Sequence, residues 1–332
     1  MSANERQPLS RLREWLLAHR PLFAILLLAP WFGEGVSTST PGLELLVPWN
    51  LAFMVALYGC GALICREVAR RWGVGLAGLA LLGAAYGVWE EALVDRYWFK
   101  PAFWDFMEVG QYSEVGGANV LVATHLTIFH AAISICASVL VVEHLFPETQ
   151  SQPWVGRTGL IIAGLTLGIA VPFVYGEFES LPATGLLVAS ALICAGLVLA
   201  AFLVPRPTTN TTPVTPHRWR RLLPWGVALC AAAHILLVYA VAQTSLPWPA
   251  GVAIAVLPVV AGMLFVRWLA TGGPYGKDAL LVIIGLLLYH LVLGAGGGLA
   301  GRYDMTFAAI LTLTGLIWLY RRTPDAQVQP VS

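Results

Sequence analysis

Two adjacent glutamates, Glu90 and Glu91, close an apolar run that is long enough for a membrane helix. Carboxylates in such a position are costly unless another group uses them. Gly83, Gly87 and Glu91 recur at every fourth residue, so they share one helix face, and the two glycines let another helix approach closely. We therefore expect Glu91 to enter a helix interface, with Glu90 about 100° round the helix on the face of Tyr86.

The next apolar run in our division of the chain, residues 119–142, carries two histidines. Thr127, His130 and Ser134 fall on one helical stripe, and a polar stripe inside a membrane points at other helices or at a cavity. His125 lies five residues before His130 and about 140° away. The two imidazoles cannot clamp one metal ion from a single helix, so the sequence predicts no metal site.

A carboxylate and an imidazole that meet inside the membrane could activate water. Glu90 or Glu91 would act as the general base, and His130 would stabilise or protonate the developing oxyanion. These three residues are the predicted catalytic set, and no cofactor is predicted. The alternative is structural: the acids rest among the headgroups beside Arg96 or Lys100, and the histidine bonds to a neighbouring helix.

Five further residues are candidates for binding or for a proton path. Glu34 lies between two glycines about 20 Å along the first span, where an ionised carboxylate needs a partner or water. Arg302 follows a glycine-rich stretch that could unwind and bind an anion, or could simply allow close helix packing. The complete set is Glu34, Tyr86, Thr127, His125 and Arg302.

Composition places the whole chain in a membrane. Of 332 residues, 58% are hydrophobic and 11% charged, against about 25% charged in soluble domains. The formal net charge of +1 gives no reason to expect a nucleic-acid partner. The sequence predicts an all-α, polytopic integral membrane helical bundle with the lipid bilayer as its partner. About ten transmembrane helices are expected, at 21–39, 46–65, 73–93, 119–142, 158–176, 183–204, 224–243, 249–268, 279–298 and 305–320.

Basic residues predict the orientation of these spans. If both termini are cytoplasmic, all of the 19 Lys and Arg residues except Arg96, Lys100 and Arg302 lie on the cytoplasmic side. Such a bias is typical of a multi-pass protein of the cell membrane. A Pro- and Thr-rich stretch divides the spans six and four. The predicted segments are an amphipathic N-terminus (1–20), a six-helix bundle (21–204), a linker (205–223), a four-helix bundle (224–320) and a tail (321–332).

The pair Glu90-Glu91 followed by His130 resembles the glutamate-type intramembrane protease superfamily, which includes the CAAX protease and bacteriocin-processing group and the PrsW-like group. The resemblance implies that these residues activate water for peptide cleavage. The chain departs from the EExxxR pattern, since Asp95 stands where the arginine would be, and it lacks FxxxH. The stretch Tyr58 to Trp72, YGxGAxxxRExxRRW, also resembles bacterial membrane proteins without an assigned function.

Three classes of function follow. The first is a membrane-embedded hydrolase acting on a peptide, lipid or small solute. The second is a proton-coupled transporter of a small solute or ion, in which the glycine-rich end of the ninth span forms a broken helix. The third is a structural or accessory membrane protein without an active site. The outer Glu/His set favours the hydrolase.

Overall fold

The fold is almost entirely helical in the part of the chain that the computed structural model describes, which is residues 14–100, 109–175, 182–206, 219–270 and 275–324. The exception is one short antiparallel pair, β1 (Glu114–Val115) with β2 (Ala118–Asn119). Eight helices in the described ranges are long and apolar enough to cross a membrane. The predicted all-α polytopic bundle is therefore confirmed.

Many spans are continuous helices in which an α-helical segment runs into a π-helical or 3₁₀ turn. In chain order the helical elements are α2 (Arg20–Pro30), η1 (Trp31–Val36), α3 (Gly42–Leu45), α4 (Pro48–Met54), η2 (Val55–Gly59), α5 (Cys60–Trp72), α6 (Leu76–Val88), η3 (Trp89–Val94), η4 (Tyr97–Phe99), α7 (Val109–Tyr112), α8 (Val120–Phe129), η7 (His130–Ala137), α9 (Ser138–Leu145), η8 (Pro147–Thr149), α10 (Arg157–Tyr175), α11 (Thr184–Leu203), η9 (Arg220–Leu222), α12 (Leu223–Ala242), α13 (Trp248–Leu269), α14 (Lys277–Gly297), η11 (Gly298–Ala300) and α15 (Tyr303–Arg322).

The remaining two expected spans correspond to shorter apolar helices, α2 continued by η1, and α10. The count of ten spans therefore stays a prediction, as does the six-and-four division, because most of the linker lies outside the described residues. One predicted boundary is wrong. The second span does not end at Arg66 but continues to Trp72, where Gly73 closes the helix in the left-handed conformation with φ of 66°.

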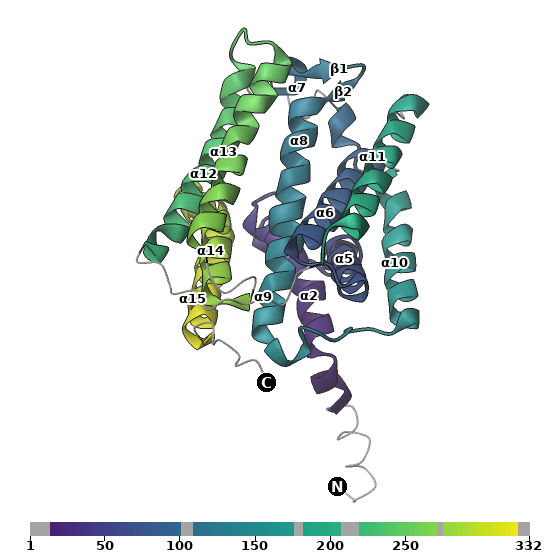
Figure 1. The fold of residues 1–332 in the computed structure, drawn as a ribbon, viewed down its shortest axis with the longest axis vertical. Coiled ribbons are helices and arrows are strands. Elements are labelled where there is room, and N and C mark those ends of the chain that lie inside the picture. Colours follow the sequence, from purple (N-terminus) through teal and green to yellow (C-terminus); the bar gives the residue numbers. More distant parts are fainter. Residues whose placement is uncertain (1–13, 101–108, 176–181, 207–218, 271–274, 325–332) are drawn as a thin grey trace, which may run out of the picture.

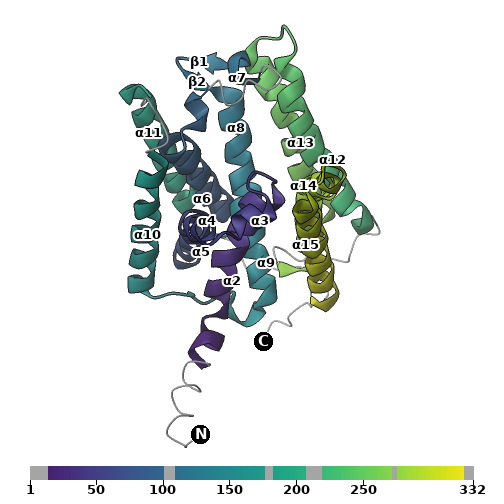
Figure 2. The same ribbon diagram turned by 180° about the vertical axis from the view of Figure 1, so that it is seen from behind.

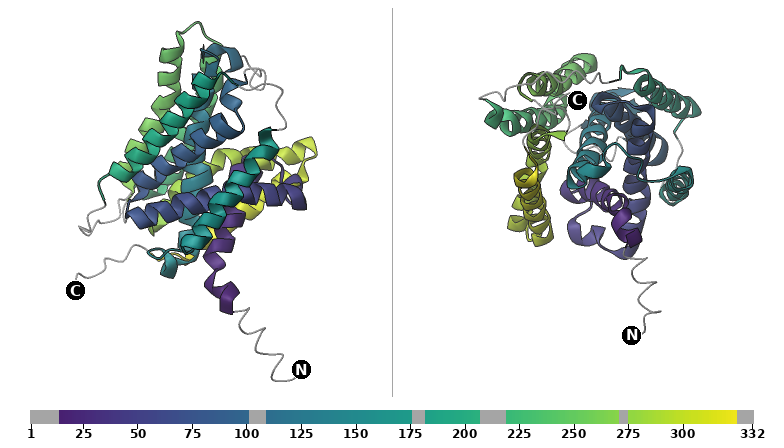
Figure 3. Two further views of the ribbon diagram at one scale, coloured as in Figure 1. Left: turned by 90° about the vertical axis from the view of Figure 1, so that its right-hand side faces the viewer. Right: turned by 60° about the horizontal axis from the view of Figure 1, so that its bottom comes forward.

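The central helices α2, α5, α6, α8 and α9 have α10 and α11 on one side and α12 to α15 on the other (Figure 1 and Figure 3). Viewed from behind, α3 and α4 lie over the centre of the molecule (Figure 2). The chain enters α2 and leaves α15 at the same end of the molecule, which agrees with termini on one side of the membrane (Figure 1). That this side is cytoplasmic remains a prediction from the basic residues.

The two glycines of α6 bring this helix against the α8–η7 helix, as their spacing predicts. A Cβ atom added at Gly83 would lie 3.0 Å from the Cα of Ala131, and one at Gly87 would lie 3.3 Å from the Cα of Thr127. Because glycine carries only a hydrogen atom in place of a side chain, the two helix backbones can approach this closely. This contact places the end of α6 beside His130, which lies at the start of η7.

Candidate functional site

Four π-helical turns interrupt the central helices, and each carries part of one polar cluster. Glu34 belongs to η1, Tyr58 to η2, Glu90 and Glu91 to η3, and His130 to η7. A π turn inserts one residue into the i→i+4 hydrogen-bond pattern of the helix and changes the direction of the side chains around it. Such turns are rare in proteins overall, but they occur often at functional sites. The coincidence of four of them marks this cluster as the candidate site.

The carboxylates of Glu90 and Glu91 each approach a different nitrogen of the His130 ring. Glu91 Oε1 lies 2.8 Å from Nε2, and Glu90 Oε2 lies 3.0 Å from Nδ1. Ser134 Oγ lies 3.1 Å from the same Nδ1. The glutamates and the histidine are buried. Both glutamates therefore reach the imidazole, whereas the sequence assigned only Glu91 to the interface.

Several polar atoms of this cluster have no hydrogen-bond partner within the described ranges. They are Oε1 of Glu90, Oε2 of Glu91 and the hydroxyl of Tyr86, and all of them are buried. A buried polar group without a partner costs about 1–3 kcal/mol. Packing alone gives no reason for the chain to bear that cost at three such atoms. The cluster therefore offers carboxylate oxygens that can accept hydrogen bonds or bind a ligand.

Tyr58 connects the cluster to Glu34. Its hydroxyl donates a 2.6 Å hydrogen bond to Glu34 Oε1, and the Thr40 hydroxyl donates one of 2.7 Å to Oε2. The Tyr58 ring stacks on His130, with 5.9 Å between centroids and an interplanar angle of 28°. Glu34 thus has the hydrogen-bond partners that an ionised carboxylate at this position would need. Sequence reasoning did not name Tyr58 as a site residue, although Tyr58 is the first residue of the YGxGAxxxRExxRRW stretch.

Replacing Tyr58 by phenylalanine should destabilise the protein, because the half-buried carboxylate of Glu34 loses its closest donor. Hydrogen bonds to charged groups contribute about 1.5–3 kcal/mol. Thermal unfolding in detergent measures the loss. Tyr86→Phe is the matched control, since the Tyr86 hydroxyl has no hydrogen-bond partner in the described residues and its removal should leave the transition temperature unchanged or raise it. Equal losses in the two variants would show that the Glu34 contact contributes nothing.

Two of the other predicted binding residues also lie at the cluster. The Tyr86 ring stands edge-on to His130 at 5.9 Å between centroids. Thr127 lies where α8 crosses Gly87, one helical turn before the histidine. Both therefore contribute to the surroundings of His130.

His125 is not part of this cluster. Its Nδ1 lies 3.0 Å from Nε2 of His234 on α12, and His234 Nδ1 lies 2.7 Å from the Ala255 carbonyl on α13. A carbonyl only accepts, so His234 Nδ1 carries a proton, and in the neutral pair His125 Nδ1 donates to His234 Nε2. The pair ties α8 to the α12–α15 unit. The structural interpretation of His125 and His234 is thus favoured.

Arg302 also lies elsewhere, at an exposed end of the molecule. Its guanidinium pairs with Glu44 at 3.1 Å and with Asp304 at 3.2 Å. The glycine-rich stretch before it stays helical to Gly297, and a Cβ atom at Gly294 would lie 3.3 Å from the Cβ of Ala309 on α15. Gly294 therefore serves close packing with α15. Because the stretch is helical and not unwound in the described structure, it gives no support to the anion-binding alternative or to the broken helix expected of a transporter.

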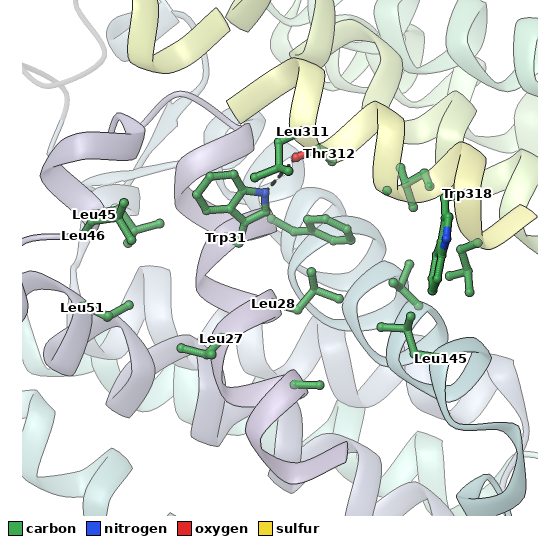
Figure 4. Close-up of a pocket in the computed structure, with 16 residues that line it drawn as sticks. Leu27, Leu28, Trp31, Leu45, Leu46, Leu51, Leu145, Leu311, Thr312 and Trp318 are labelled. Atoms are coloured by element: carbon green, nitrogen blue, oxygen red, sulfur yellow. Dashed lines mark hydrogen bonds between the residues drawn. The ribbon is translucent and has the colours of Figure 1, made fainter. Parts of the chain in front are cut away.

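A separate apolar cavity of about 520 Å³ opens between α2, α9 and α15. Figure 4 shows its wall of leucines and tryptophans, in which Trp31 Nε1 donates a 2.8 Å hydrogen bond to Thr312 Oγ1. The described residues that line it include no titratable side chain. These residues therefore offer an apolar surface, and Trp31 begins the same π turn that carries Glu34.

Comparison with known proteins places the chain at the level of a family. No curated protein and no solved structure matches it. The comparisons give no support to the resemblance to glutamate-type intramembrane proteases. The sequence pattern of one family, described as an uncharacterized membrane protein family, matches residues 23–272, a stretch that contains all four π turns and the cluster that they form. The chain belongs to this uncharacterized family of membrane proteins.

Proposed function

We propose that the protein is a membrane-embedded hydrolase whose active site is the cluster of Glu90, Glu91 and His130. The observation that carries this proposal is the 2.8 Å contact between Glu91 Oε1 and His130 Nε2, beside carboxylate oxygens that have no partner in the described residues. Carboxylate and imidazole within hydrogen-bond reach are the groups that acid–base catalysis of hydrolysis requires.

The reaction divides between these groups. A carboxylate oxygen of Glu91 or Glu90 takes a proton from water, and the resulting hydroxide attacks the substrate carbonyl carbon. His130 donates a hydrogen bond to the oxyanion that forms. When the scissile bond breaks, the proton held by the carboxylate passes to the leaving group, so that no net proton is gained or lost. Tyr58, stacked on the ring, holds its orientation.

Burial of the site selects the substrate. The three side chains lie among helices that span the membrane, so the scissile bond has to reach them within or at the edge of the bilayer. An amide of a membrane-embedded peptide or an ester or amide of a lipid meets this condition. Glu34 and its partner Thr40, which are connected to the cluster through Tyr58, are half-buried.

The test is hydrolysis by the purified protein in lipid nanodiscs of two probes, a quenched-fluorescent transmembrane peptide and a 4-nitrophenyl acyl ester. Wild-type protein is expected to cleave at least one probe, and Glu91→Gln and His130→Gln each to lower kcat by about 10²–10⁴-fold. Glu44→Gln is the matched control, because Glu44 is an exposed carboxylate paired with Arg302, and it should keep the wild-type rate. Absence of cleavage, or equal rates in wild type and Glu91→Gln, would refute the proposal.

A proton-coupled transporter remains the alternative, and one observation favours it. Thr40, Glu34 and Tyr58 form a hydrogen-bonded chain that ends against His130, and such chains can carry protons. The hydrolysis assay separates the two functions, since a transporter cleaves neither probe.

A further inference from the structure

We propose that Glu90, Glu91 and His130 bind one Zn²⁺ ion. One donor atom from each of the three side chains can be chosen so that all three atoms lie within 4.8 Å of one another. The inference rests on the proposed hydrolase for the role of the metal but not for its binding. The sequence predicted no metal site because only ligands on a single helix were considered, and this proposal reverses that prediction. The ligands come instead from two helices that the glycines of α6 hold in contact.

The charge balance of the cluster calls for a cation. Glu90 and Glu91 are both buried, and each has a carboxylate oxygen without a hydrogen-bond partner in the described part of the chain. When both groups are ionised, two carboxylates beside one imidazole leave a net negative charge even if the ring is protonated. Buried charges are paired or coordinate metals. A divalent cation would neutralise both carboxylates and use their free oxygens at once.

The donor set selects the kind of metal. One imidazole nitrogen with two carboxylate oxygens is a mixed N/O set that suits Zn²⁺, whereas Mg²⁺ and Ca²⁺ prefer oxygen alone. Catalytic zinc sites hold three protein ligands and keep a fourth position for water. At metal–ligand distances of about 2.0–2.2 Å the donor atoms stand roughly 3.3 Å apart. The chosen donor atoms lie within 4.8 Å of one another, so the carboxyl groups would have to turn toward the ion to reach these distances.

Ser134 identifies the ligating nitrogen. The two nitrogens of an imidazole point in different directions, so a single ion meets one of them. Glu90 Oε2 at 3.0 Å and the Ser134 hydroxyl at 3.1 Å both approach Nδ1, whereas Nε2 lies beside Glu91 Oε1 and would face the metal. A metal-bound histidine usually donates its other N–H to a neighbouring acceptor, and the Ser134 hydroxyl can accept it when Glu90 turns from Nδ1 toward the ion. Ser134 is therefore a positioning residue.

Zinc also assigns a function to the neighbouring tyrosine. The hydroxyl of Tyr86 is buried without a hydrogen-bond partner in the described residues, and its ring contacts His130. A water on the open position of the metal would give this hydroxyl a partner. In the hydrolase, the metal would polarise that water, and the second oxygen of a ligating carboxylate would accept its proton.

The experiment measures zinc directly. Full-length protein in detergent is stripped with EDTA, dialysed against Zn²⁺ and analysed for bound metal. Wild type should bind one equivalent, with Ca²⁺ and Mg²⁺ failing to compete. Glu90→Gln, Glu91→Gln and His130→Gln should each weaken binding by at least the 10–100-fold typical of outer-shell changes, and Ser134→Ala by about that factor. Co²⁺ absorption should report a four-coordinate site in wild type.

Two controls keep the result specific. Glu34→Gln changes a neighbouring carboxylate already held by Tyr58 and Thr40, and His234→Gln removes the second histidine cluster; both should retain zinc. Thermal unfolding of each metal-free variant establishes that it is folded. Failure of wild type to bind zinc, or unchanged binding in folded Glu91→Gln and His130→Gln, would overturn the inference.

The outcome is independent of hydrolysis. Zinc binding without cleavage of either probe would support the metal site and remove the proposed hydrolase. Cleavage by metal-free protein would support the hydrolase and overturn the role of zinc in it, while zinc binding itself would still be decided by the metal analysis.

Discussion

Replacing Arg66 by methionine is expected to lower the free energy of unfolding by about 3–5 kcal/mol, the cost of removing one partner from a buried ion pair. The Arg66 side chain is fully buried in the middle of α5. Its Nε donates to Glu143 Oε1 at 3.0 Å and its Nη1 to Glu67 Oε1 at 2.8 Å. Methionine fills most of the space but donates no hydrogen bond.

Arg66 also fixes the chain that follows α9. Its guanidinium donates to the carbonyl oxygens of Thr149, Gln150 and Gln152 and lies over the Trp154 ring, 3.8 Å from the centroid. These carbonyls lose their donor in the variant. We therefore expect the segment 149–155 to loosen, which would also release the start of α10.

Neighbouring cations limit the loss. Glu143 retains Arg70, whose Nε lies 2.9 Å from Oε1, and Glu67 retains Arg71 at 3.0 Å. Arg70 also donates to the Tyr275 hydroxyl. Burial raises the pKa of Tyr275 to about 12, so that this hydroxyl remains neutral beside Glu143. Since both carboxylates keep a cation, the effect should lie in the lower part of the range.

Unfolding in detergent, followed by thermal scanning or titration with denaturant, measures this change. Arg302→Met is the matched control, because Arg302 also pairs with two carboxylates but is 42% exposed. Exposed pairs contribute little, so its transition should stay at the wild-type position. If the two variants unfold together, the Arg66 network does not stabilise the fold.

Hydropathy and spacing predicted the parts of the fold that depend on nearby residues. Helix positions follow from apolar runs, and the contact of Gly83 and Gly87 with the α8–η7 helix follows from a four-residue repeat. The predicted end of the second span was wrong because it depends on a residue that is distant in the sequence. Arg66 counts against a membrane helix by itself, and its partner Glu143 is 77 residues away.

The candidate site was only partly predictable because its geometry depends on π turns and on distant pairs. The sequence identified Glu90, Glu91 and His130 as reactive, but α-helical spacing directed only one glutamate at the histidine. No local pattern signals the bond between Tyr58 and Glu34, which are 24 residues apart, or between His125 and His234, 109 apart. Such pairs arise only when helices pack.

Replacing Gly87 by valine should disrupt the candidate site and the fold together. A Cβ atom at this position would lie 2.9 Å from the Cβ of His130 and 3.3 Å from the Cα of Thr127. Because these atoms belong to a packed helix and cannot move aside singly, the α8–η7 helix has to shift. Overpacking of this kind costs about 1–3 kcal/mol, and the apparent Tm should fall by roughly 2–4 °C for each kcal/mol.

Gly168→Val on α10 is the control for this substitution, because no atom lies within 4 Å of a Cβ atom added there. Valine forms helices somewhat better than glycine, so this variant should unfold at or slightly above the wild-type temperature. The shift of His130 away from the glutamates in Gly87→Val should also abolish probe hydrolysis and zinc binding, which Gly168→Val should preserve. A Gly87→Val protein with wild-type Tm and full zinc occupancy would show that α6 and η7 do not need this close approach. The site would then have to be assembled by contacts other than the glycine face of α6.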